Sequence, residues 1–183
     1  MPSIRPLPFK VDVGPAVAQI DEHPEFWDRY TTRTASYGSP HDVSDIWVRY
    51  NDWRKFRRAP EKFNDEHESV WYPCITVLWH LLPIISGVYH EVGGMQLGGV
   101  LITRIRPNGE VRPHRDAGWH ASHYQKYAVQ LKGNADQCFH FVDSKLSPLP
   151  GDVYTFDNSH THWVTNDSKE DRMTLIICIR SIE

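Results

Sequence analysis

The chain has 183 residues, which is long enough for one ordinary domain with its own hydrophobic core and short for two. Apolar residues make up 40% and charged residues 23% of the sequence, values of globular proteins that argue against wholesale disorder. The formal net charge of −3 argues against a general nucleic-acid binder, which usually carries a strong basic excess.

The N-terminal part of the chain has a mixed pattern of helix and strand. Residues 24–30 predict a short helix with Asp21 as its cap, and the alternation over residues 46–50 predicts a strand. A second helix is predicted from Pro73, because apolar residues recur at helical spacing up to residue 82. Pro83 is expected to kink or end this helix.

From residue 97 onward the pattern is that of β-strands separated by turns. Strands are predicted over residues 97–105, 127–131, 139–141, 152–156 and 173–179. The last of these is apolar on both faces, so we expect a central, fully buried strand. Five or six short strands with turns between them predict a sandwich or barrel, with the N-terminal helices packed outside it.

No internal repeat or linker divides the chain, so we expect a single domain over residues 1–183, with a mixed part at 1–96 and the β core at 97–183. The N-terminus lacks an apolar core of signal-peptide length, and no apolar stretch is long enough to span a bilayer. The three cysteines are odd in number and far apart, which favours free thiols in a reducing compartment. We therefore expect a cytoplasmic protein that does not use the membrane.

The residues that carry chemistry lie near the C-terminus. His114 and Asp116 form a His-x-Asp triplet, and His162 and Arg172 follow. The triplet alone is a weak signal, because with eleven His and fourteen Asp about one such triplet is expected by chance. A turn histidine beside a carboxylate that caps a backbone amide is the alternative. The triplet lies just past a predicted strand and turn, where a rigid β scaffold would hold a site.

Two imidazoles and one carboxylate bind Fe(II) on one face and leave three coordination positions open. A 2-oxo acid would chelate two of these positions and dioxygen would take the third, and oxidative decarboxylation of the acid then drives oxidation of a substrate C–H bond. Arg172, ten residues after His162, is suited to hold the distant carboxylate of such an acid by a two-pronged ion pair. Four protein ligands would instead close the shell and suit structural zinc.

Other histidines compete for the metal. His120 and His123 lie in the loop after the triplet, and His160 lies two residues before His162. For each of the three, a surface position or a substrate contact is the simpler interpretation. We prefer His162 as the ligand, because a turn and a return strand over the next ten residues would bring Arg172 back over the metal.

These motifs resemble the aspartyl/asparaginyl β-hydroxylase family of Fe(II)/2-oxoglutarate-dependent oxygenases over about residues 98–180. The resemblance rests on residues 103–114, 127–131, 151–157, 162–166 and 172–176. The order and spacing of Phe-Asp, His and Arg toward its end are its most specific feature. It implies a double-stranded β-helix (jelly-roll, cupin-like), mainly β with flanking helices, that binds Fe(II) and uses 2-oxoglutarate and O2 as co-substrates.

The resemblance also implies roles for single residues. His114 and His162 correspond to iron-binding histidines, and Arg172 corresponds to the partner of the far carboxylate of 2-oxoglutarate. Thr103, eleven residues before the first histidine, falls where the family has a hydroxyl residue against the same carboxylate. An ordinary strand threonine is the alternative. Gln130 falls near a family histidine at the other end of 2-oxoglutarate, and a buried glutamine is costly without partners.

The chain departs from the family pattern at three places. Animal members that modify secreted domains have Gly at the position of Asp116, whereas here Asp116 completes a triad. The arginine that precedes their strand histidine falls on Ala128, and either Lys126 substitutes for it or no residue does. The loop over residues 117–126 is longer, so substrate specificity should not be inherited.

We therefore expect a 2-oxoglutarate-dependent hydroxylase whose substrate is a small molecule or a protein side chain, with an amino acid side chain preferred. Trp119, His120 and Arg49 are candidate substrate contacts, with a structural role as the alternative. A second hypothesis is a cupin-like metal protein that is not an oxygenase, such as an isomerase or binding module with zinc or manganese, and it needs no Arg172. A third is a silent interaction module that uses the basic cluster over residues 54–58. The substrate and the oligomeric state stay open.

Overall fold

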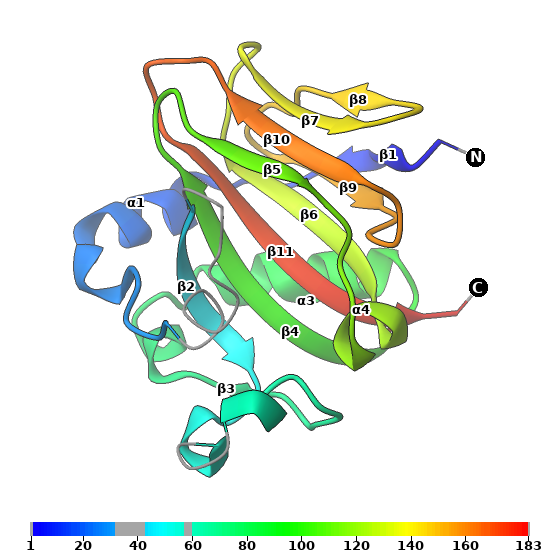
Figure 1. The fold of residues 1–183 in the computed structure, drawn as a ribbon. Helices are drawn as coiled ribbons and strands as arrows, with labels where there is room; N and C mark the ends of the chain where they lie inside the picture. The colour runs from blue at the N-terminus through cyan, green and yellow to red at the C-terminus, as the bar shows by residue number, and fades with distance from the viewer. Residues whose placement is uncertain (1, 32–42, 57–59, 183) are drawn as a thin grey trace.

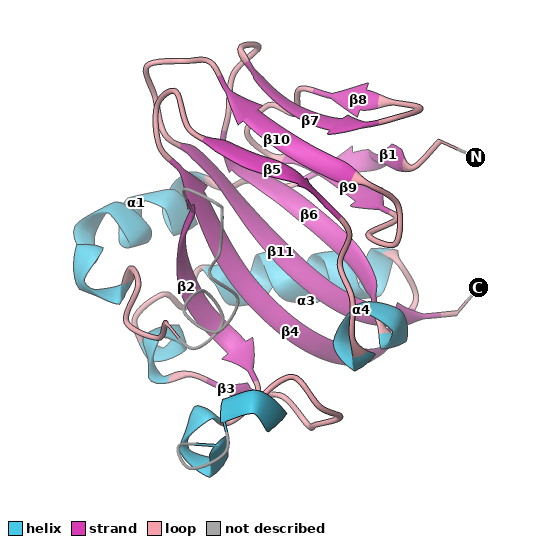
Figure 2. Cartoon of the chain, in the orientation of Figure 1, coloured by secondary structure: helices cyan, strands magenta, loops and turns pink. Residues whose placement is uncertain are grey.

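A computed structural model describes residues 2–31, 43–56 and 60–182 of the chain (Figure 1). Within these ranges the chain forms two antiparallel β-sheets that face each other, with helices against the outer face of the larger sheet (Figures 1 and 2). This architecture is the double-stranded β-helix, or jelly-roll, that the sequence predicted.

The strands of both sheets come from all parts of the described residues. The larger sheet has the order β1 (Ile4–Lys10), β9 (Asp152–Phe156), β6 (Gln125–Lys132), β11 (Arg172–Ser181), β4 (Gly94–Ile105), β2 (Val43–Tyr50) and β3 (Val70–Trp71). The smaller sheet has the order β5 (Glu110–His114), β10 (His162–Asn166), β7 (Gln137–Phe141) and β8 (Lys145–Leu146). β11 lies in the middle of the larger sheet, which confirms the predicted central strand.

The side chains of β11 alternate between two hydrophobic clusters. Leu175, Ile177 and Ile179 pack on the outer face of the sheet with buried residues of α1 (Gly14–Glu22) and α3 (Leu81–Glu91). The opposite face of β11 points between the two sheets, where aromatic residues of β7 and β9 form a second cluster. Because side chains of a strand alternate with a period of two, one face of β11 builds the helix-covered core and the other faces the space between the sheets.

Two helix predictions are wrong, each for a local reason. The first helix is α1, in which Ala16 and Ile20 are the buried residues and lie one turn apart. Residues 24–30 contain only a 3₁₀ turn at Pro24–Phe26. Pro83 lies in the first turn of α3 rather than at the end of a helix. The N–H groups of a first turn have no acceptor within the helix, so a proline there costs little.

β5 and β10 form strands at residues where the sequence pattern predicted turns or the ends of strands. Both are five residues long and carry polar side chains that hide their alternation. They pair with each other, and β10 also pairs with β7. His114 is therefore the last residue of β5. His162 is the first residue of β10, the neighbouring strand of the same sheet.

Other expectations concern the surface and the thiols. Within the described ranges the cysteines form no disulfide, as expected, and they are Cys74, Cys138 and Cys178. Across the described ranges, none of the helices has the length and apolar character needed to cross a membrane. In the basic cluster, Arg54 pairs with Asp52 at 2.8 Å, while Arg57 and Arg58 lie outside the described residues.

Replacing Ile177 by Ala is expected to lower the free energy of unfolding by about 2 to 5 kcal/mol, because the change leaves a cavity at a fully buried site. Urea denaturation measures the effect. Ile182→Ala is the control, since Ile182 is 70% exposed. A loss for Ile177→Ala as small as that of the control would contradict the position of β11 between the two clusters.

Candidate metal centre

The candidate metal centre begins with the pairing of β5 and β10. In this antiparallel pair His114 lies directly opposite His162, and their ring centroids are 4.3 Å apart. Asp116 follows two residues after the end of β5. Its backbone N–H donates to the carbonyl oxygen of Asn158 in the β9–β10 loop at 3.0 Å. The same loop therefore leads into β10 and holds the segment that follows β5.

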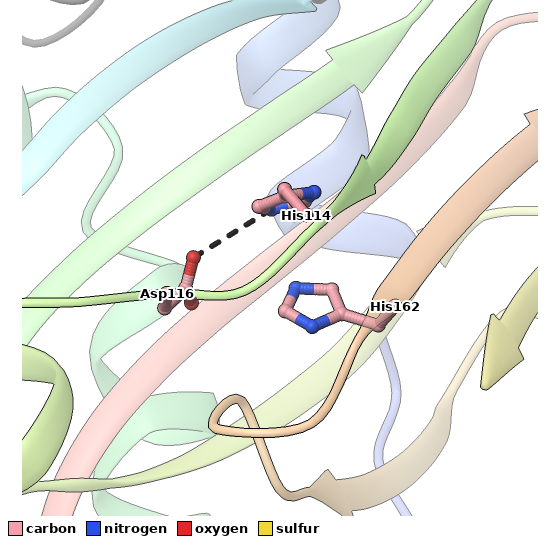
Figure 3. Close-up of side chains that lie close together, drawn as sticks. All are labelled: His114, Asp116 and His162. Atoms are coloured by element: carbon pink, nitrogen blue, oxygen red, sulfur yellow. Dashed lines mark ion pairs between the residues drawn. The ribbon is translucent and has the colours of Figure 1, made fainter. Parts of the chain in front are cut away.

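The side chains of His114, Asp116 and His162 point toward one another (Figure 3). Each offers one ligand atom, and the three atoms lie within 4.8 Å of one another. Nδ1 of His114 lies 2.8 Å from the carbonyl oxygen of Arg112, and Nδ1 of His162 lies 2.9 Å from that of His160. A carbonyl oxygen only accepts hydrogen bonds, so each Nδ1 carries the proton and each Nε2 keeps its lone pair for a metal.

The charges of these side chains also suit a metal. Burial by itself raises the pKa of Asp116, but the ammonium of Lys126, which is bonded to its Oδ2, and the two histidines outweigh burial and hold the pKa at about 2. Burial lowers the pKa of His162. Neutral imidazole and ionised carboxylate are the states that bind a divalent metal. Two nitrogens and one carboxylate oxygen fit Fe(II) and leave part of its coordination shell open.

The three residues line a cavity of about 680 Å³ between the sheets. Much of its wall is apolar and comes from the inner faces of several strands, with Ile105, Val111, Phe139, Phe156, Val164 and Ile176 among its residues. Polar groups reach it at a few points. Tyr50 and Asn64 line it from the N-terminal half of the chain. An apolar cavity with a few convergent polar groups is the usual form of a small-molecule site.

Arg172 is the buried cation of this cavity, with only 3% of its surface exposed. Its Nη1 donates to Oγ1 of Thr174 at 2.8 Å, and its Nη2 donates to Tyr154 and Gln130 at 3.1 Å each. Its Nε is buried and has no hydrogen-bond partner among the described residues. A buried donor without a partner is costly in a folded protein, and a bound anion would satisfy it.

The other two predicted co-substrate residues differ in position. Thr103 lines the cavity, and its hydroxyl donates to the carbonyl oxygen of Thr174 at 3.4 Å. Gln130 is fully buried and is not among the described residues that line the cavity. Its amide nitrogen donates to two backbone carbonyls, and its oxygen accepts from Arg172 and Tyr154. Its direct partner is therefore the guanidinium of Arg172.

The three candidate substrate contacts differ in whether they line the cavity. His120 lines the cavity, whereas Arg49 and Trp119 are not among its lining residues in the described part of the chain. Arg49 donates to the carbonyl oxygens of Leu97 and Gly98 at 2.7 Å each. Trp119 stacks on a neighbouring histidine of the short helix α4 (Trp119–His123). These two side chains have structural partners.

His120 is anchored to β4. Its Nε2 accepts the backbone N–H of Gly99 at 3.1 Å, and its ring lies 5.1 Å from that of Tyr50. A Cβ atom at Gly99 would come within 2.8 Å of the Tyr50 ring, so glycine permits this close approach. Burial is the main cause that lowers the pKa of His120 to about 3, and the nearby His67 lowers it further.

Sequence reasoning missed Tyr154, Thr174 and Asn158. Tyr154 and Thr174 are buried residues with hydroxyl groups at inward positions of their strands, and a buried hydroxyl needs a partner, which is a signal that could have identified them. Asn158 acts on Asp116 through its backbone carbonyl, and its side chain donates to the carbonyl oxygen of Ala121 at 3.3 Å. A backbone contact leaves no trace in residue type.

Comparisons with known proteins identify the family and agree with the fold. The sequence model of the family described as aspartyl/asparaginyl beta-hydroxylase matches residues 31–181. No protein with a curated description matches the sequence significantly.

Solved structures share the fold at low sequence identity. A prolyl hydroxylase from Trichoplax adhaerens, in complex with a hypoxia inducible factor oxygen degradation domain peptide fragment, has a TM-score of 0.62 at 9% identity, over 97% of this chain and 83% of that chain. The viral collagen prolyl hydroxylase of Paramecium Bursaria Chlorella virus-1, in complex with 2OG, has a TM-score of 0.54 at 10% identity, and the match covers 99% of this chain and 97% of that chain. A 2OG-Fe(II) oxygenase family oxidoreductase from Burkholderia pseudomallei has a TM-score of 0.54 at 14% identity, and the match covers 92% of this chain and 91% of that chain.

Replacing His162 by Ala is expected to abolish stoichiometric Co(II) binding, because the site loses one of its three ligands. Titration calorimetry of the metal-free protein measures the binding. His160→Ala is the matched control, since the His160 ring bonds to Ser3 and lies outside the ligand set. Retention of tight binding by His162→Ala, or its loss in His160→Ala alone, would refute this ligand set.

The lowered pKa of His120 predicts that the free energy of unfolding decreases in acid. Its pKa is 6.5 in the unfolded chain and about 3 in the folded protein, so between these values the unfolded state binds more protons. Stability from this group is therefore complete above about pH 6.5 and decreases as the pH falls toward about 3. His120→Gln, whose amide oxygen can accept the Gly99 N–H, should show a smaller fall in urea midpoint on acidification than the wild type. An equal fall in both proteins would contradict this assignment.

Proposed function

The chain belongs to the aspartyl/asparaginyl β-hydroxylase family, and on this premise we propose that it hydroxylates an unactivated C–H bond of an amino acid side chain, free or within a protein. The family and the two-histidine, one-carboxylate set imply Fe(II) and 2-oxoglutarate. The class of substrate and the roles of single residues are parts of the proposal.

The observation that carries the proposal is the incompletely paired guanidinium of Arg172 in the same cavity as the three ligand atoms. A dicarboxylic 2-oxo acid has one end that chelates a metal and a carboxylate at the other end. Arg172 offers that carboxylate a buried, charge-assisted partner, which is stronger than a neutral hydrogen bond. The hydroxyls of Tyr154 and Thr174 already hold two sides of the guanidinium.

Each residue of the site then has a defined task. The chemistry that bound Fe(II) would supply is the oxidative decarboxylation of 2-oxoglutarate by dioxygen to succinate and carbon dioxide, in which one oxygen atom enters succinate and the other enters the substrate C–H bond. His114, Asp116 and His162 hold the iron through two Nε2 atoms and one carboxylate oxygen. Arg172 binds the far carboxylate, and Gln130 fixes the guanidinium from behind. The apolar wall of the cavity excludes water from the reacting groups.

The alternative of a cupin-like metal protein that is not an oxygenase accounts for fewer features. Such a protein needs the two histidines and the carboxylate but has no use for Arg172. Keeping a buried guanidinium with an unsatisfied Nε costs stability, and a ligand with a far carboxylate gives a reason for that cost. A silent interaction module would likewise have no reason to keep the cavity and the complete ligand set.

We assign the substrate to the part of the cavity lined by Tyr50, Asn64 and His120. These residues belong to segments other than those that hold the metal and the proposed co-substrate. A screen of free amino acids and short peptides with the iron-loaded protein, read by mass spectrometry for the gain of one oxygen atom, tests the substrate class. Stimulation of 2-oxoglutarate turnover only by compounds that are not amino acids or peptides would contradict it.

Arg172→Lys is expected to raise the KM for 2-oxoglutarate by about 10- to 100-fold, because lysine keeps the charge but loses the fork that binds a carboxylate with two hydrogen bonds. Succinate formation as a function of 2-oxoglutarate concentration measures the change. Arg180→Lys, at an exposed position of the same strand, is the control. An unchanged KM in Arg172→Lys would remove Arg172 from the co-substrate site.

A further inference from the structure

We propose that Lys126 is a positioning residue of the metal centre, which holds one oxygen of Asp116 so that the carboxylate presents its other oxygen to the metal. This inference rests on the proposed function, because it assigns a partner to one of the three metal ligands. It concerns a contact that the sequence did not predict. Asp116 follows β5 and Lys126 lies near the start of β6, so the connection that contains α4 separates them in sequence, and their side chains form an ion pair.

The two oxygens of Asp116 have different neighbours. Oδ1 lies 3.6 Å from Nε2 of His114, on the side of the other ligand atoms. Oδ2 accepts a hydrogen bond from the ammonium of Lys126. The carboxylate is therefore already divided into one oxygen directed to the ligand set and one oxygen directed to a cation of the protein.

Lys126 is held in this position by its own strand. It lies in β6, where it pairs opposite Phe156 of β9, and its backbone carbonyl accepts the hydroxyl of Thr155 at 3.0 Å. Its ammonium lies 5.9 Å from the centre of the Phe156 ring, and 19% of its side chain is exposed. Asp116 is its one ion-pair partner among the described residues. A lysine fixed in this way differs from a mobile surface lysine.

The number of carboxylate oxygens on the metal explains why such a contact matters. A carboxylate that binds through both oxygens fills two coordination positions and leaves one fewer for the co-substrate and dioxygen. An ammonium on Oδ2 disfavours this mode. It also compensates the charge of a buried carboxylate, so the side chain of Asp116 is oriented before a metal binds.

A contact between Lys126 and the co-substrate is the competing interpretation. The cavity argues against it, because Lys126 is absent from the described residues that line the cavity, whereas Arg172 and Thr103 line it. The two interpretations predict different measurements. A partner of Asp116 changes the affinity for the metal alone, and a partner of 2-oxoglutarate changes the affinity for the acid.

The test uses the full-length, metal-free protein and Co(II), without 2-oxoglutarate. Lys126→Met is expected to raise the dissociation constant for Co(II) by about 10- to 100-fold, the usual effect of removing the partner of a metal ligand. Lys126→Arg restores a cation at the same place and should recover most of the affinity. Lys132→Met is the matched control, because Lys132 lies in the same strand and pairs with the exposed Asp21, remote in sequence from the metal ligands.

Circular dichroism and thermal melting check that each variant folds. Should Lys126→Met fail to fold, Lys126→Gln serves in its place, since it keeps a hydrogen-bond donor without the charge, and a smaller loss of Co(II) affinity in the same direction is expected. Equal Co(II) affinity in the folded variant and the wild type would overturn the proposal. So would a rise in the KM for 2-oxoglutarate with unchanged Co(II) affinity. A wild-type protein that binds no Co(II) would overturn the metal centre itself, and the role of Lys126 with it.

Discussion

The candidate metal centre depends on the register between β5 and β10. This register sets His114 opposite His162, so two residues that are far apart in the sequence become cross-strand neighbours. A slip of one residue would turn one of the two side chains to the other face of the sheet and separate the ligand atoms. The hydrogen bonds from each Nδ1 to a backbone carbonyl two residues earlier then orient the rings. Backbone pairing thus sets the positions of the two histidines, and local hydrogen bonds set the orientations of their rings.

The larger sheet supplies the second half of the site through the alternation of β11. Its outward residues, such as Leu175 and Ile177, are covered by helices and stabilise the strand. Its inward residues include Arg172 and Thr174, which line the cavity. The strand is buried on both faces, so its inward side chains have little freedom to move. A rigid strand therefore supports a guanidinium whose Nε has no hydrogen-bond partner among the described residues.

Burial also decides the charges in the cavity. Lys126 and the two histidines outweigh the effect of burial on Asp116 and hold its pKa at about 2. Burial is the main cause that lowers the pKa of His120 to about 3. Both side chains are therefore held in their deprotonated forms, Asp116 as an anion and His120 as a neutral imidazole. His120 lies in α4, within the connection between β5 and β6, and the ion pair of Asp116 with Lys126 links the two sides of this connection.

The sequence by itself determined which residues are candidate metal ligands and that β11 is buried, because residue types, their spacing and a run of apolar residues can be read from the residue order. The jelly-roll class was implied by the resemblance of these motifs to a known family, and the two facing sheets agree with it. The sequence did not determine which side chains contact one another across the fold. The first turn of α3 accepts Pro83, and Gln130 turns to Arg172 rather than to the cavity. Only the tertiary structure decided that Lys126 meets Asp116, since that contact depends on how a loop returns to the sheet. Long-range contacts of this kind follow from packing, and neighbouring residues carry no record of them.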